Sequence, residues 1–134
     1  MKRIVLIVAS VFGALSVVLG ALGAHALKSI LSIEKLQSFE TGVRYMMIHA
    51  LVLLIIGFVF EFKSRLQKGM AWSFISGTIL FSVSIYFLSI ADLIGLQLSF
   101  LGPITPVGGL LMITGWILLL VILSKTKLGD LTKL

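Results

Sequence analysis

Eight polar or ionisable side chains could carry chemistry in this largely apolar sequence. They are His25, Glu40, Arg44, Tyr45, His49, Asp92, Gln97 and Thr105. Glu40 and Arg44 are four residues apart, as are Tyr45 and His49, so each pair lies on one face of a helix. A histidine can titrate near neutral pH or ligate a metal, and an arginine can lock an ion pair or clamp an anionic substrate. The residue types therefore predict a polar cluster that either binds a ligand or holds helices together.

His49 is the strongest functional candidate, because it falls inside an apolar run. With a rise of about 1.5 Å per residue, it lies roughly 10 Å below the start of its helix. An ionisable group at that depth in a membrane needs a partner or trapped water. Arg44 is nearer the surface and can either pair with Asp92 across the bundle or extend to the lipid headgroups.

Catalytic and metal-binding motifs are not found in the sequence. His25, His49 and Asp92 lack the compact spacing of a metal site, so no metal or other cofactor is expected. The sequence also lacks a glycine-rich nucleotide loop, and Ser99-Phe100-Leu101-Gly102 is not a serine nucleophile elbow. These observations argue against an enzyme.

The elements that must position these residues are membrane-spanning helices. Of the 134 residues, 59% are apolar and 12% are charged, which places the chain in a bilayer. Four apolar runs reach the length of about 20 residues that a helix needs to cross it, at about residues 4–26, 42–62, 69–91 and 106–124. The sequence therefore predicts an all-α, integral membrane four-helix bundle with short loops, forming one domain over residues 1–134.

Small residues recur along the first run, at Ala9, Gly13, Ser16, Gly20 and Gly23. Steps of four and three put them on one stripe of a helix, and such a stripe lets a second helix approach closely in lipid. We expect this helix-packing seam to make the first span the closely packed centre of the bundle. Its length and the start at Met1 favour a retained span over a cleaved signal peptide.

The segments between the runs leave two alternatives open. Residues 27–41 mix charged and apolar residues three to four apart, which predicts either a short interfacial helix between spans 1 and 2 or an extension of the second span. Residues 93–101 are apolar but too short to cross, so a re-entrant segment is one interpretation.

A loop and helix-start motif precedes the fourth run. Thr105 is expected to cap that helix and Pro106 to open it, while the glycines that follow favour close approach of another backbone. The motif comprises Gly102, Pro103, Thr105, Pro106, Gly108 and Gly109.

The net charge of +6 is concentrated at the ends of the apolar runs, which indicates anionic lipid headgroups at the cytoplasmic face as partners and not nucleic acid. Eight basic residues fall on the side of the termini and three on the other side, so both termini are expected in the cytoplasm of a multi-pass plasma or inner membrane protein. This topology places the polar cluster in the outer leaflet.

Three motifs resemble a known family over essentially the whole chain. They are residues 20–27 (GALGAHAL), 41–51 (TGVRYMMIHAL) and 102–109 (GPITPVGG), followed by Gly115-Trp116. They are similar to the small membrane proteins of domain of unknown function 423, also called uncharacterised protein family 0382, which is related to transmembrane protein 256. The resemblance implies four spans, no assigned activity, and His25, Tyr45, His49, Thr105 and Pro106 as the positions that carry over. Arg44 is often glutamine in that family, so its charge is a departure.

Two classes of function fit these observations. The first is a non-enzymatic bundle that stabilises the membrane or a partner complex, as a homo-oligomer or with another membrane protein. The alternative is a carrier of a small ion, proton or lipid, or a lipid-binding protein, that uses an outer-leaflet polar cavity around His49.

Overall fold

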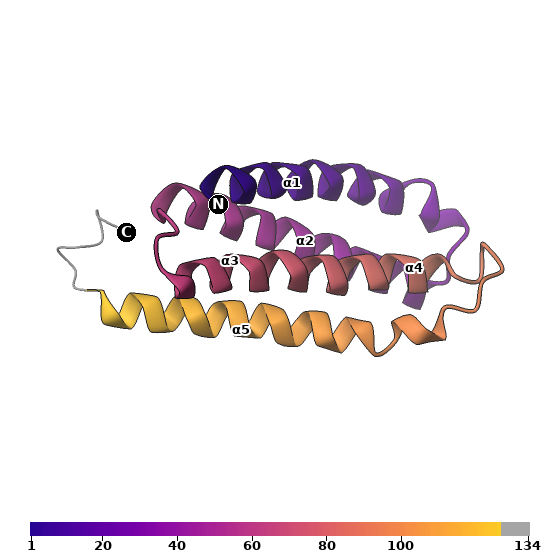
Figure 1. The fold of residues 1–134 in the computed structure, drawn as a ribbon. Helices are drawn as coiled ribbons and strands as arrows, with labels where there is room; N and C mark the ends of the chain where they lie inside the picture. Colours follow the sequence, from indigo (N-terminus) through magenta and orange to yellow (C-terminus); the bar gives the residue numbers. More distant parts are fainter. Residues whose placement is uncertain (127–134) are drawn as a thin grey trace.

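The computed structural model describes residues 1–126, which form long helices and, within that range, no strands. The helices are α1 (Lys2–Ala24), α2 (Ile33–Val59), α3 (Arg65–Thr78), α4 (Ser84–Ile90) and α5 (Ile104–Lys125). A π-helical segment, Ile79–Val83, joins α3 and α4 into one continuous span. Four helical segments are thus long and apolar enough to cross a membrane, which confirms the all-α four-span prediction (Figure 1).

Consecutive spans are antiparallel neighbours. α1 packs on α2, α2 packs on the α3–α4 span, and α5 packs on the other side of that span (Figure 1). The expectation that the first span is the centre is wrong. In its most apolar window 22% of residues are buried, against 39% for α2 and 44% for the α3–α4 span. The reason is that α1 buries only one stripe, against α2, and leaves its other faces uncovered.

The small-residue seam of α1 is used over part of its length. Ala9, Ser16 and Gly23 are buried. A Cβ atom on Gly20 would lie 3.5 Å from the Val43 side chain, and one on Gly23 would lie 3.4 Å from the Phe39 side chain; Val43 and Phe39 are both on α2. Gly13 differs, because a Cβ atom there would meet nothing within 4 Å. Gly13 is therefore not part of the contact.

The tightest helix crossing joins α3 to α5 and is made of glycine. A Cβ atom on Gly108 would overlap the backbone nitrogen of Phe81 and lie 2.9 Å from the Gly77 carbonyl oxygen. A Cβ atom on Gly77 would lie 2.8 Å from the Met112 nitrogen. The prediction of a close backbone approach at Gly108 and Gly109 therefore holds for Gly108 only, since a Cβ atom on Gly109 would meet just the Phe81 side chain, at 3.9 Å.

The π-helical segment ties this crossing to α2. Ser82 is buried in the segment, and its hydroxyl donates to the Gly42 carbonyl oxygen at 3.0 Å. A π segment inserts an extra residue into a helical turn and shifts the side chains that follow it. That shift places Ser82 toward α2 while Phe81 meets Gly108 of α5.

Of the two alternatives for residues 27–41, the extension of the second span is confirmed. α2 begins at Ile33, where the Ser32 hydroxyl accepts from the Lys35 backbone N–H at 3.4 Å and Glu34 lies in the first turn. Both features favour a helix start. The alternative of a separate interfacial helix is wrong, since only a single 3-10 turn, Leu27–Ser29, precedes α2.

The fourth span starts earlier than predicted. α5 begins at Ile104 with Pro103 as its N-cap, so the prediction that Thr105 is the cap is wrong. The Thr105 hydroxyl instead lies 2.7 Å from the Ser84 hydroxyl of α4. Pro106 falls in the first helical turn, where a missing N–H removes no intrahelical bond. Residues 91–95 form turns and residues 96–98 are irregular, followed by one 3-10 turn at Ser99–Leu101, so this segment is not a re-entrant helix.

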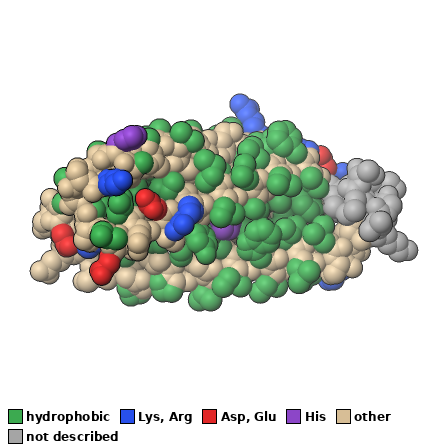
Figure 2. All heavy atoms as spheres, turned by 180° about the vertical axis from the view of Figure 1, so that it is seen from behind, with side chains coloured by type: hydrophobic (Ala, Val, Ile, Leu, Met, Phe, Trp, Pro, Cys, Tyr) green, Lys and Arg blue, Asp and Glu red, His purple; other side chains and the backbone are tan. Residues whose placement is uncertain are grey.

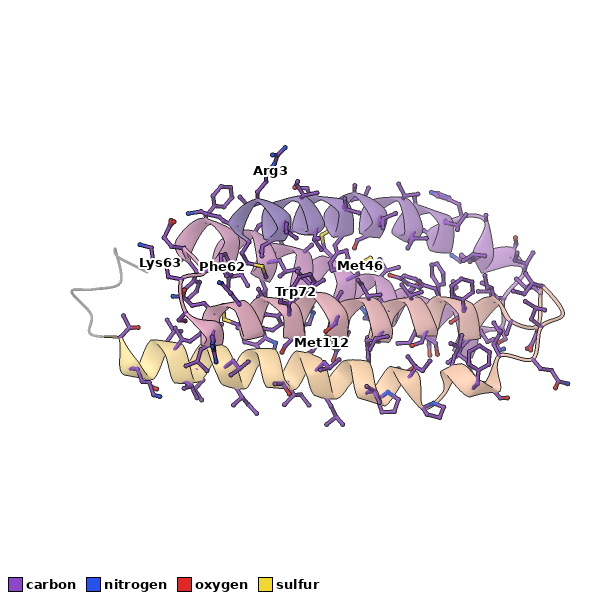
Figure 3. All side chains as sticks on the ribbon, viewed as in Figure 1. Arg3, Met46, Phe62, Lys63, Trp72 and Met112 are labelled. Atoms are coloured by element: carbon purple, nitrogen blue, oxygen red, sulfur yellow. The ribbon has the colours of Figure 1, made fainter. Side chains whose placement is uncertain are left out.

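An ion pair closes the other end of the α1–α2 pair. The Lys2 ammonium donates to Glu61 Oε1 at 2.6 Å, just beyond the end of α2. Arg3 extends away from the bundle at the same end, where Lys63 also lies (Figure 3). The hydrogen bond from Lys2, and next its charge, hold the pKa of Glu61 below its usual value of 4.5.

This pKa shift predicts a pH dependence of the α1–α2 contact. Because the pKa is lowered by folding, the pair contributes stability above about pH 4.5, and this contribution is lost as pH falls through the lower folded-state value. An NMR titration of the Glu61 carboxyl carbon should give a midpoint below 4.5, and Lys2→Gln should move it back toward 4.5. An identical midpoint in the two proteins would contradict the pair.

Candidate functional site

The predicted polar residues do not form one cluster. His25, Glu40, Arg44, Tyr45, Asp92 and Gln97 are exposed, Thr105 is half-buried, and His49 is buried. His25, Asp92, Gln97 and Thr105 lie at the end of the bundle where α2 begins, whereas Arg44, Tyr45 and His49 lie near the middle of α2, because that helix begins at Ile33. Residue number also does not set the direction in which a side chain points, and these residues face different surroundings. The prediction that these residues form one polar cluster at the outer end is therefore wrong, and His49 lies deeper than the roughly 10 Å expected from a helix that starts near Gly42.

His49 is enclosed by aromatic rings. Its side chain is 3% exposed, and its ring centroid lies 6.1 Å from that of Tyr45, 5.7 Å from that of Phe74 and 6.4 Å from that of Trp116. The Nδ1 atom is 2.8 Å from the Tyr45 carbonyl oxygen, which can only accept, so Nδ1 carries a proton. Nε2 is buried and has no hydrogen-bond partner among the described residues. His49 therefore joins α2 to α3 and α5 and lines none of the pockets described below.

Arg44 and Asp92 do not pair. Arg44 donates to the Thr41 hydroxyl at 3.2 Å, whereas Asp92 Oδ2 lies 2.7 Å from the Lys35 ammonium. Arg44 and Glu40 line a groove between α1 and α2, of about 250 Å³, whose floor includes Gly20 and Gly23. The proposed pairing of Arg44 with Asp92 is thus wrong, because Lys35, on the extended start of α2, is the nearer cation.

A second pocket, here called the end pocket, combines charged and hydroxyl side chains. It lies where the first turns of α2 meet α4 and the start of α5, and it has a volume of about 340 Å³. It is lined by Glu34, Lys35, Ser38, Ile85, Leu88, Ser89 and Thr105. Sequence reasoning had selected only Thr105. The four-residue spacing of Glu34 and Ser38 could have indicated that the two side chains share one face of a helix, but only if residues 33–41 were already known to be helical.

Hydrogen bonds fix which hydroxyls of the end pocket can donate. Ser38 donates its only hydroxyl proton to the Glu34 carbonyl oxygen at 3.0 Å. Ser84 donates to the Phe81 carbonyl oxygen at 3.0 Å, so the proton between Ser84 and Thr105 must come from Thr105. The oxygens of Ser38 and Thr105 are left as acceptors. Ser89 is 3% exposed, and its buried hydroxyl has no hydrogen-bond partner among the described residues.

Metal binding is not indicated by the described part of the chain, residues 1–126, in which no three histidine or acidic side chains converge. On the face seen in Figure 2, most charged side chains lie toward the two ends of the molecule, and apolar side chains cover much of the region between them. This distribution is typical of a protein whose middle faces lipid.

The comparisons with known proteins agree with this picture. A family model described as "Protein of unknown function (DUF423)" matches residues 19–109. The chain belongs to this family. The DUF423 match includes the three motifs at residues 20–27, 41–51 and 102–109, which contain His49 and the Gly108 crossing.

Related proteins are named only by their membrane location. The chain is 37% identical to the UPF0382 membrane protein YwdK of Bacillus subtilis, over 92% of this chain and 98% of that protein. It is 34% identical to a UPF0382 membrane protein of Staphylococcus epidermidis, over 92% and 97% of the two chains, and 34% identical to the UPF0382 inner membrane protein YgdD of Escherichia coli, over 90% and 88%. No solved structure matches. This DUF423 chain is therefore a membrane protein of a family of unknown function.

Proposed function

We propose that this protein is a non-enzymatic bundle that stabilises the membrane or a partner complex. The observation that carries the proposal is that polar side chains, from the buried Ser82 to the exposed Asp92, lock the helices together. The Ser82 hydroxyl, in the π-helical segment before α4, donates a hydrogen bond to the Gly42 carbonyl oxygen of α2. A hydrogen bond between Thr105 and Ser84 joins α5 to α4, and the Lys35–Asp92 ion pair joins the start of α2 to the residue after α4. A bundle held in this way presents fixed outer faces on α1 and α5, and such faces suit contact with another membrane protein or a second copy.

The topology that goes with this proposal has both termini in the cytoplasm. The basic residues at the end that carries Lys2, Lys63 and Lys125 support it, because cytoplasmic loops are enriched in lysine and arginine. The end pocket then opens at the opposite, extracytoplasmic side. Because the chain has no cysteine, single cysteines at Ser64 and Gln97 can be labelled separately. An impermeant maleimide should label the Gln97→Cys protein in intact cells and the Ser64→Cys protein only after lysis.

Cross-linking in native membranes tests the assembly role. A photo-reactive amino acid at Val18, an exposed residue of α1, should give a covalent adduct with a second copy or another membrane protein. The same group at buried Met46 is the control and should give none. If exposed positions on α1 and α5 give no adduct, and deletion of the gene changes no response to envelope stress, the proposal fails.

A second candidate function is lipid binding at the end pocket, favoured by its mixed lining of charges, hydroxyls and apolar side chains. A carrier of protons or ions that works through His49 has less support, because aromatic rings enclose that side chain. Liposomes with the purified protein should therefore show the same proton and cation flux as liposomes with His49→Ala, at the level of empty liposomes. Flux that depends on His49 would restore the carrier hypothesis.

A further inference from the structure

We propose that the end pocket binds a primary ammonium group on a small organic molecule, either the headgroup of an aminophospholipid or a free amine. This inference rests on the binding function suggested above for the same pocket and names its ligand class. It follows from three properties of the pocket: its hydrogen-bonding sense, its charge and its shape.

The hydrogen-bonding sense of the pocket is that of an acceptor. Ser38 and Thr105 have each given their hydroxyl proton to another oxygen, so their lone pairs are what remains for a ligand. Glu34 adds a carboxylate, which accepts only. A ligand that bonds to Ser38, Thr105 and Glu34 must therefore bring N–H or O–H donors, and a primary ammonium group brings three.

Ser89 supplies the observation that points to an occupant. It lines the pocket, is 3% exposed, and has a buried hydroxyl without a partner among the described residues. Leaving a buried hydroxyl unpaired is unfavourable, and rotation of the Ser89 side chain toward the pocket would let a ligand group bond to it and recover that cost. In the same lining, Ser38 and Thr105 are already engaged.

The charge of the pocket is negative although a lysine lines it. The Lys35 ammonium is 2.7 Å from Asp92 and 3.4 Å from the Leu88 carbonyl oxygen, so its charge is paired and two of its three N–H donors have partners. Glu34 makes no ion pair within residues 1–126. The amino termini of α2 and α5 and the carboxyl terminus of α4 also meet here. Each helix end contributes about half a charge, so the three ends together add about half a positive charge. With the full negative charge of Glu34, the pocket carries a net charge of roughly minus one half.

The shape of the pocket favours an organic ammonium over a bare metal ion. Its volume of about 340 Å³ is far larger than one ion, and Ile85 and Leu88 provide apolar wall beside the acceptors. Methylene groups next to the nitrogen would contact these two side chains, while the nitrogen faces Glu34 and the hydroxyls. This arrangement matches an aminoethyl group.

The test compares lipids that differ in donors but not in charge. The purified full chain in nanodiscs should retain phosphatidylethanolamine in native mass spectrometry in preference to phosphatidylcholine, whose quaternary nitrogen carries the same charge without N–H donors. Glu34→Gln should reduce this retention about tenfold or more, because it removes a charge-assisted bond. Glu40→Gln is the matched control: it removes another exposed carboxylate of α2, which lines the α1–α2 groove, and should change nothing.

Soluble amine separates the two ligand sources. In nanodiscs of phosphatidylglycerol, ethanolamine hydrochloride should shift the NMR signals of Ser38, Ser89 and Thr105, and Ser89→Ala should weaken binding by about three- to tenfold. Binding of ethanolamine without retention of the lipid would keep the ammonium site and reject the lipid-binding function. The proposal is overturned if Glu34→Gln leaves both ligands unaffected, if potassium chloride competes as well as ethanolamine, or if phosphatidylglycerol is the lipid retained.

Discussion

Replacing Gly108 with alanine is expected to lower the free energy of unfolding by about 3 kcal/mol, the upper part of the usual range for forcing atoms into a packed interior. The added Cβ would overlap the backbone nitrogen of Phe81 and lie 2.9 Å from the Gly77 carbonyl oxygen and the Phe81 Cα. These are backbone atoms of a helix, which cannot rotate away as a side chain can. α5 must therefore move outward, and it loses dispersion contacts that lipid does not fully replace.

Two other glycines serve as controls in the same protein. Gly109 is the next residue of α5, and a Cβ there would lie 3.9 Å from the Phe81 ring, an ordinary contact. Gly13 would gain a Cβ with nothing within 4 Å. Both alanine variants should unfold within about 1 kcal/mol of the wild type, since helix propensity then acts alone. Steric trapping in micelles measures the free energy of unfolding of each variant. If the Gly108→Ala protein is as stable as the Gly109→Ala protein, α5 can move away from α3 without loss of stability, and the prediction is wrong.

The contrast between Gly108 and Gly13 explains what the sequence could predict about packing. Both sit among small residues in an apolar helix, and periodicity correctly places such residues on shared stripes. Which stripe meets a neighbouring helix depends on the partner, and in a membrane an uncovered stripe costs little because lipid is as apolar as a helix interface. Thr105 and Pro106 indicate a helix start just before Gly108, which helps to identify Gly108 as a residue that contacts another helix. No neighbouring residue distinguishes Gly13, which makes no such contact, from Gly20, which does.

The candidate site was harder to predict for a related reason. Apolar length and basic residues predicted the four spans, so residues such as Arg44 and Asp92 could be assigned to a span or a loop. Their direction around the helix could not be assigned, and the structure separates them: Asp92 meets Lys35, and Arg44 faces the α1–α2 groove. Ser89 is one of several hydroxyl residues in its span, which the sequence alone assigns to helix packing, and only tertiary contacts show that its hydroxyl has no partner among the described residues.

His49→Ala is expected to have the second largest effect, a loss of about 2–3 kcal/mol of unfolding free energy. The imidazole packs beside the Phe74 and Trp116 rings, which also contact each other, and deleting a buried side chain of this size leaves a cavity. Ile48 is the adjacent residue and is 52% exposed on the lipid side, so Ile48→Ala should stay within about 0.5 kcal/mol of the wild type. Equilibrium unfolding in mixed micelles with increasing dodecyl sulfate would rank the proteins.

His49→Phe separates the shape of this side chain from its chemistry. Phenylalanine keeps an aromatic ring between α2, α3 and α5 and removes the Nε2 atom that has no partner among the described residues. The Tyr45 carbonyl oxygen loses the Nδ1–H donor but keeps the backbone N–H of its own helix, so no buried acceptor is orphaned. We therefore expect the His49→Phe protein to be within about 1.5 kcal/mol of the wild type. If it is that stable but the cell then shows the envelope response of the deletion strain, the imidazole itself acts in the function, and the interpretation of His49 as a packing residue is wrong.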